Sequence, residues 1–174
     1  MKQLLLVSWL LSLSAILGLP EVKADVRMPL IFGNHMVLQQ DTRITIWGCA
    51  DAGENIEVLF AGQKVRTTAN AGGTWQVKLK PVKTKKKGET LTITGKNKLV
   101  YSDVLVGDVW VASGQSNMEW GIKVRKEYAD DIAHSEDSLL RLFFVPKNTS
   151  LQPLSEIEIP QGTASPERAA RWVL

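Results

Sequence analysis

The sequence is poor in the residues that build disulfides and metal centres. Its 174 residues include one cysteine, Cys49, and two histidines, His35 and His134. One cysteine excludes an intramolecular disulfide framework and a cysteine-based zinc site, and two histidines exclude a three-histidine metal centre. The net charge is also small, because 21 basic and 18 acidic side chains leave a formal charge of only +3. That surplus is too small to predict a nucleic-acid-binding or membrane-binding surface.

Only one long hydrophobic run is present, and it lies at the N-terminus. Met1 and Lys2 precede a nearly continuous apolar stretch at residues 4–19, and Val22-Lys23-Ala24 follows with a signal-peptidase pattern. We therefore predict a signal peptide over residues 1–24, cleaved after Ala24, and export to the periplasm or the cell exterior. A membrane anchor is the alternative, but the run is shorter than the roughly 20 residues needed to span a bilayer. The mature chain is expected to have no membrane contact.

The pattern from residue 25 to about residue 103 is typical of β-structure. Short stretches rich in β-branched and aromatic residues alternate with glycine-containing turns, without a helical period, which favours an antiparallel β-sandwich. Trp47 and Trp75 are interpreted as core residues, and sugar-stacking platforms are the alternative. The basic stretch Lys80–Gly88 is interpreted as a solvated hairpin loop, because no aromatic or arginine side chain interleaves with its lysines. The predicted strands are Arg43–Trp47, Ile56–Phe60, Lys64–Thr68, Thr74–Lys80 and Thr90–Thr94.

The segment that follows carries the candidate chemistry. Val104–Ser113 begins as an apolar run, which is typical of a strand buried on both faces, and Gly114 allows a sharp turn after it. Ser116 would then stand where a helix begins, at the edge where open α/β sheets place their sites. Its hydroxyl could face a crevice while its N–H faces a developing oxyanion. Ser116 or Asn117 could equally be a simple N-cap, and spacing alone does not separate the two.

Several stretches of the mature chain resemble one enzyme family. The block at residues 107–119 (GDVWVASGQSNME) is similar to the first motif of the SGNH (GDSL-like) hydrolases, and its GQSNM resembles the nucleophile motif of the sialate O-acetylesterase branch. In this branch a glutamine, here Gln115, takes the place of the aspartate in the general motif. Further similarity lies upstream at residues 32–40 (FGNHMVLQQ), 46–48 (IWG), 73–75 (GTW) and 105–108 (LVGD), and downstream at residues 140–146 (LRLFFVP) and Trp172.

The resemblance implies hydrolysis of acetyl esters through a serine nucleophile. Ser116 corresponds to that nucleophile, which forms an acetyl-enzyme, and its backbone N–H corresponds to one oxyanion-hole donor. The family uses no metal and no organic cofactor, so none is expected here. Its base is a histidine in an Asp-x-x-His block near the C-terminus, and later blocks supply the remaining oxyanion donors. Only 174 − 116 = 58 residues follow Ser116, so we expect a chain truncated after the first catalytic block, with little or no turnover.

One stretch of this chain has the spacing of the family's Asp-x-x-His block. Asp131 to His134 reads Asp-x-x-His, but it lies in the polar stretch Arg125–Leu139, which is interpreted as the helix or loop that leads to the next strand. We therefore expect His134 to be a surface residue and His35 to be structural, with neither acting as the base of Ser116.

These inferences predict a mixed fold in two parts. Residues 25–103 form the antiparallel β-sandwich, and residues 104–174 form the first β/α units of an incomplete SGNH-type domain with a doubly wound parallel sheet. The predicted function is hydrolysis of O-acetyl esters on sialic acid or related acetylated carbohydrates, with Ser116 as nucleophile. The alternative is an exported, non-catalytic β-sandwich module that binds a glycan or a partner protein.

Overall fold

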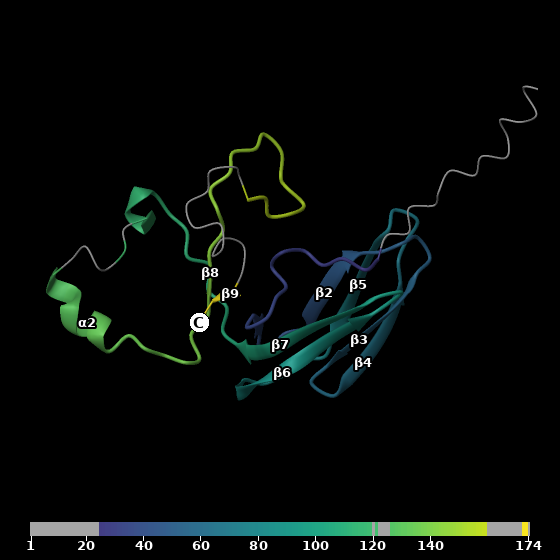
Figure 1. Cartoon of the computed structure of the whole chain (residues 1–174), viewed down its shortest axis with the longest axis horizontal. Coiled ribbons are helices and arrows are strands. Elements are labelled where there is room, and N and C mark those ends of the chain that lie inside the picture. The colour runs from purple at the N-terminus through teal and green to yellow at the C-terminus, as the bar shows by residue number, and fades with distance from the viewer. Residues whose placement is uncertain (1–24, 120, 122–125, 160–171, 174) are drawn as a thin grey trace, which may run out of the picture.

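The computed structural model describes residues 25–119, 121, 126–159 and 172–173. The predicted signal peptide, residues 1–24, lies outside this part of the chain. Figure 1 shows the strands up to β7 gathered at one side of the molecule, and the shorter elements that follow them at the other. The seven strands are β1 (Val37–Gln39), β2 (Ile44–Cys49), β3 (Asn55–Phe60), β4 (Gln63–Thr68), β5 (Thr74–Leu79), β6 (Lys85–Thr94) and β7 (Lys98–Gly107).

The seven strands form two sheets. The larger sheet has the order β1-β7-β6-β3-β4, and β2 pairs with β5 in a separate antiparallel sheet. Neighbours in the larger sheet are antiparallel, except that β1 runs parallel to β7, with Val37 opposite Leu105 and Gln39 opposite Gly107. The larger sheet is therefore mixed, whereas the sequence predicted antiparallel pairing throughout.

Alternating apolar residues from both sheets fill one hydrophobic core. In β5, Trp75, Val77 and Leu79 are buried while the residues between them are exposed, as the alternation predicts. β2 and β3 contribute their alternate residues to the same cluster of buried side chains. Each fully buried large aliphatic side chain is worth about 1.5–3 kcal/mol of transfer free energy, so this shared cluster holds the two sheets together.

All five predicted strands are present, with ends shifted by a few residues. The largest shift is in β6, which begins at Lys85, so the second half of the predicted loop at Lys80–Gly88 is strand and not loop. Its lysines are exposed to solvent, as expected of this stretch. Periodicity did not reveal β1, because three residues are too few to show an alternation.

The prediction of a buried strand over Val104–Ser113 holds for its first residues, since residues 104–106 are buried in β7, and is wrong for residues 108–113. β7 ends at Gly107, and Val109, Trp110 and Val111 are exposed and lie in no strand. β7 ends there because its neighbour β1 also ends there. The last residue of β1, Gln39, pairs with Gly107. The domain boundary predicted between residues 103 and 104 therefore falls inside a continuous strand.

The assignment of Trp47 to the core is also wrong, whereas that of Trp75 is confirmed. Trp47 is 41% exposed, because Ile44 and Ile46 of the same strand face the core and the alternate positions face outward. Its indole packs edge to face against Phe32, with the ring centroids 4.7 Å apart.

The elements after β7 are short. Two 3₁₀ helices, η1 (Ser116–Glu119) and η3 (Lys126–Tyr128), precede the helix α2 (Ala129–Ala133). The strands β8 (Leu142–Phe143) and β9 (Trp172–Val173) then pair antiparallel. Among the residues that the structure describes, no helix is long and apolar enough to cross a membrane.

The shared core predicts how two aliphatic truncations will differ. Ile46→Ala removes a side chain with no exposed surface and should lower the free energy of unfolding by about 2–4 kcal/mol. Leu59→Ala, on the exposed face of β3, is the matched control and should cost less than about 1 kcal/mol. Urea unfolding of the two variants measures the difference, and equal losses would contradict the assignment of the core.

Candidate active site

Ser116 lies in a short turn beyond the end of β7. Residues 108–114 have no regular structure, and Ser116 is the first residue of η1. The turn is closed by the N–H of Met118, which donates to the carbonyl of Gln115 at 2.9 Å. A Cβ at Gly114 would lie 2.8 Å from the Met118 Cγ, so the absence of a side chain at Gly114 lets Met118 fold back over it. A helix does start at Ser116, of the 3₁₀ type, but β7 ends nine residues earlier at Gly107, so the prediction that Ser116 stands directly at the end of a strand is wrong.

Two glutamines at the end of β1 anchor the beginning of this segment. Gln39 accepts a hydrogen bond from the N–H of Val109 through its side-chain oxygen at 2.9 Å. The Gln40 side chain donates to Asp108 at 3.1 Å, and its backbone N–H donates to the carbonyl of Gly107 at 2.9 Å. The sequence analysis gave these glutamines no such part, since only the parallel pairing of β1 with β7 brings them to the residues after Gly107.

The side chain of Ser116 is exposed and not paired with either histidine. No hydrogen bond joins it to His35 or His134 within the described part of the chain. His134 follows α2, is exposed as predicted, and contacts the Asp130 carbonyl oxygen through Nδ1 at 2.7 Å. The described residues therefore present a serine hydroxyl to solvent without a base beside it.

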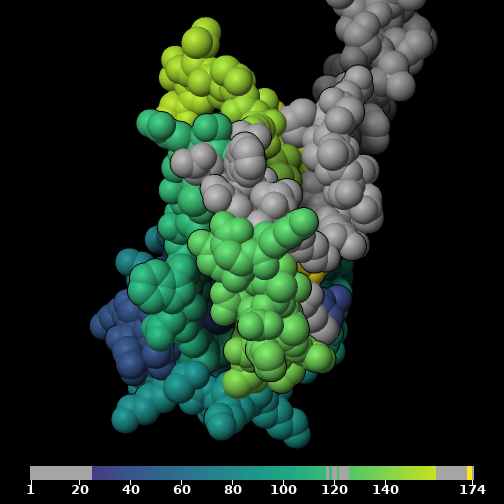
Figure 2. Space-filling view, turned by 90° about the vertical axis from the view of Figure 1, so that its left-hand side faces the viewer, coloured from purple at the N-terminus to yellow at the C-terminus, as the bar shows by residue number. Residues whose placement is uncertain are grey.

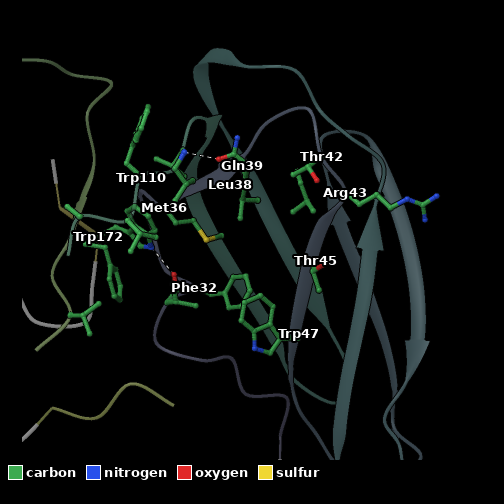
Figure 3. A pocket seen from close by; sticks show the side chains of 18 residues that line it. Phe32, Met36, Leu38, Gln39, Thr42, Arg43, Thr45, Trp47, Trp110 and Trp172 are labelled. Carbon is green, nitrogen blue, oxygen red and sulfur yellow. Dashed lines mark hydrogen bonds between the residues drawn. The ribbon is translucent and has the colours of Figure 1, made fainter. Parts of the chain in front are cut away.

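An apolar cavity of about 380 Å³ lies between β2 and the segment that leads to Ser116. Figure 3 shows Phe32 and Trp47 ring to ring at the cavity, with Trp110 and Trp172 on the side away from β2. Trp110 is 88% exposed, whereas the indole N–H of Trp172 donates to the Ile31 carbonyl at 2.7 Å. Ser116 does not line this cavity.

Three charged or titratable residues, His35, Asp103 and Arg141, contact one another at the ends of the segment that carries Ser116. His35 Nδ1 donates to Asp103 Oδ2 at 2.8 Å, and Arg141 Nη2 donates to the same oxygen at 3.1 Å. The hydrogen bond from His35, together with the bond and charge of Arg141, lowers the pKa of Asp103 below its usual value of 3.8, although burial opposes the shift. His35 thus has the structural part expected of it. Among the described residues, no three His, Cys, Asp or Glu side chains come together to hold a metal ion.

Comparison with curated proteins shows which family this chain resembles in sequence. It is 32% identical to the sialate O-acetylesterase of Mus musculus and 34% identical to that of Rattus norvegicus, over 141 residues that cover 72% of this chain. The human sialate O-acetylesterase is 29% identical over the same length. The chain is a sialate O-acetylesterase homologue. It spans about a quarter of the length of these relatives, 26% of the mouse protein and 25% of the rat protein. No family model matches it.

A solved structure extends the likeness to the fold. A carbohydrate acetylesterase from Xanthomonas citri superposes with a TM-score of 0.73 at 33% identity, over 85% of this chain and 32% of that enzyme. Identity at this level over most of the chain indicates common ancestry as well as a shared fold. The resemblance seen in the motifs around Ser116 is thereby confirmed for this acetylesterase homologue, while the part played by Ser116 stays a prediction.

The contacts of Asp103 predict how stability depends on pH. A carboxylate whose pKa is lowered by folding stabilises the folded state above its usual pKa, and this contribution is lost as the pH falls through the lowered value. Asp103→Asn should therefore reduce the free energy of unfolding on the order of 1 kcal/mol at pH 6, since the carboxylate is partly exposed and screened. Urea unfolding below pH 3.8 should show the two proteins converging. A difference that does not change with pH would contradict this account.

Proposed function

We propose that this chain supplies the nucleophilic serine of an esterase that removes acetyl groups from sialic acid or related carbohydrates. The observation that carries the proposal is the homology to sialate O-acetylesterases and a carbohydrate acetylesterase in a chain that contains the GQSNM turn. The exposure of Ser116 at the start of η1 supports the proposal, because a nucleophile must be reachable by an ester.

In the proposed reaction the Ser116 Oγ attacks the acetyl carbonyl carbon. The Oγ–carbonyl bond forms, the bond to the sugar oxygen breaks, and the serine proton passes through a base to the leaving sugar hydroxyl. Water then cleaves the acetyl-enzyme to acetate and free serine. The N–H of Ser116 would donate to the oxyanion that develops on the carbonyl oxygen.

The proposal includes weak or absent turnover for these 174 residues by themselves. A serine hydroxyl without a base is a poor nucleophile at neutral pH. Neither histidine is hydrogen-bonded to Ser116 among the described residues; His35 contacts Asp103 and His134 contacts the Asp130 carbonyl. We propose further that residues 1–24 direct export, and that a β domain, which includes β7 to its end at Gly107, is followed by the beginning of an SGNH-type hydrolase domain.

The purified chain should hydrolyse 4-nitrophenyl acetate no faster than Ser116→Ala does. The physical reason is that neither histidine is hydrogen-bonded to Ser116 among the described residues. The release of 4-nitrophenol measures the rate. Hydrolysis that is well above the buffer rate and is lost in both Ser116→Ala and His134→Asn would contradict this expectation and make His134 the base.

A chimera tests the nucleophile directly. Residues 25–173 would replace the matching third of the Xanthomonas citri carbohydrate acetylesterase, which would supply the rest of the fold. We expect this chimera to release acetate from O-acetylated sugars, and Ser116→Ala to reduce kcat by on the order of 10³-fold or more.

Ser113→Ala is the matched control for the chimera. Ser113 is also exposed and lies three residues before Ser116, so its replacement should leave kcat within about twofold of the unmodified chimera. A folded chimera whose hydrolysis survives Ser116→Ala, or falls equally in both variants, would overturn the proposed role of Ser116.

A second candidate function, glycan binding, is favoured by the exposure of Trp47. Its ring lines the 380 Å³ cavity and is held by Phe32, as a stacking platform for a sugar ring would be. If the chain binds a glycan on an array, Trp47→Ala should weaken that binding by about two- to tenfold, as expected for the loss of one stacking contact. Leu59→Ala, exposed on β3, should not weaken it. Binding by the unmodified chain that Trp47→Ala leaves unchanged would exclude this cavity as the site.

A further inference from the structure

The segment that carries Ser116 is joined at its two ends by one ion pair. The chain leaves the sheet after β7 and returns at β8, and Asp103 lies in β7 while Arg141 lies directly before β8. Thirty-eight positions separate them along the chain, yet Arg141 Nη2 lies 3.1 Å from Asp103 Oδ2. Figure 1 shows the chain after β7 passing outward to α2 and back to β8, and Figure 2 shows this part of the chain in front of the sheets.

Arg141 is buried, so its charge depends on these contacts. Its side chain is only 4% exposed. One amino group, Nη1, donates to the carbonyl oxygens of Ser138 and Leu140, and the other donates to Asp103. The buried Nε has no partner among the described residues. Asp103 is itself partly exposed, but its carboxylate is the acidic partner of the buried guanidinium, so its loss leaves the Arg141 charge uncompensated and should displace the Arg141 side chain.

Asp103 itself is held from three sides. His35 donates to the oxygen that Arg141 also contacts. On the other side, a Cβ at Gly88 would lie 2.2 Å from Asp103 Oδ1 and 2.7 Å from its Cα, so Asp103 packs directly against the backbone of β6 at a position where a larger residue would not fit. His35 and Asp103 both have left-handed backbone conformations, with φ of 65° and 52°. Such conformations persist in non-glycine residues where the surroundings determine them, and they concentrate at functional sites.

The consequences of this contact reach the apolar cavity. Phe143 lies two residues after Arg141, in β8, and its ring packs on Trp172 with the centroids 5.2 Å apart. Phe143 and Trp172 both line the cavity beside the segment that leads to Ser116. A shift of Arg141 would therefore move β8 and, with it, one wall of the cavity.

We propose that His35, Asp103 and Arg141 form a clamp that holds the two ends of the Ser116 segment together and thereby positions Ser116. This inference rests on the proposed function for the importance of Ser116, but the clamp itself is a structural claim that is tested separately. Asp103 and Arg141 are positioning residues, because neither contacts the reacting serine.

Hydrogen–deuterium exchange of the purified chain tests the clamp. Asp103→Asn and Arg141→Gln should each accelerate exchange in peptides from residues 138–143 and 108–119 by about tenfold or more, with little change in β3, β4 and β5. The double variant should resemble the single variants, because each of them already breaks the same contact. Glu57→Gln is the matched control. It removes a carboxylate whose pKa is also lowered, by Lys64 and Arg66, at a pair of strands that does not touch the clamp.

His35→Asn is a milder variant, which keeps the test decisive if Asp103→Asn or Arg141→Gln fails to fold. Asparagine tolerates the left-handed backbone and removes only the partly exposed ring, so the same two peptides should exchange faster by a smaller factor, about threefold. If none of the three single variants accelerates exchange in residues 138–143 beyond Glu57→Gln, or if acceleration is uniform over the chain in His35→Asn, the clamp is wrong.

Activity of the chimera separates the clamp from the proposed function. Asp103→Asn should lower kcat in the chimera, and raising the fold stability by other means should not restore it. A chimera without hydrolysis would remove the proposed function while faster exchange in the chain variants would still support the clamp. A chimera whose kcat needs Ser116 but is indifferent to Asp103→Asn and Arg141→Gln would keep the function and overturn the positioning role.

Discussion

The structure depends on β7, the strand that joins the hydrophobic core to the segment with Ser116. Val104 and Val106 are buried in the shared core, while the backbone of the same strand pairs with β6 on one side and with β1 on the other. The parallel pair with β1 ends at Gly107, and the two glutamines at the end of β1, Gln39 and Gln40, contact the next residues of the chain. The point at which the chain leaves the sheet is thus set by a ladder that is anchored in the core.

The chemistry that this arrangement offers is incomplete among the described residues. A hydroxyl exposed at a helix start is accessible to an ester, but nucleophilic attack needs a group that removes its proton. Among the described residues neither histidine is hydrogen-bonded to Ser116; one lies in the Asp103 cluster and one at the end of α2. The chain matches about a third of the Xanthomonas citri acetylesterase and a quarter of the mouse and rat relatives.

The sequence predicted the strands where burial is one-sided and failed where pairing depends on distant partners. Alternation in Thr74–Lys80 identified β5 and its buried face, because side chains of a strand point alternately to core and solvent. The apolar run at residues 104–113 looked like one buried strand, but only its first residues have neighbours on both sides. Trp47 was assigned to the core on its residue type alone, whereas the phase of β2, set by Ile44 and Ile46, turns it outward.

At the candidate site, local chemistry could be predicted and long-range contacts could not. The turn at Gly114 and the helix start at Ser116 follow from residue types next to one another, and the likeness to acetylesterases was visible in the same few residues. No local pattern pairs His35 with Asp103 or Asp103 with Arg141, since these contacts join residues 68 and 38 positions apart. The sequence alone therefore determined the strand-forming faces, the serine turn and the family likeness, because each depends on neighbouring residues. Only the tertiary structure decided which apolar residues are covered and which charges meet, because both depend on how the sheets and the returning chain pack in space.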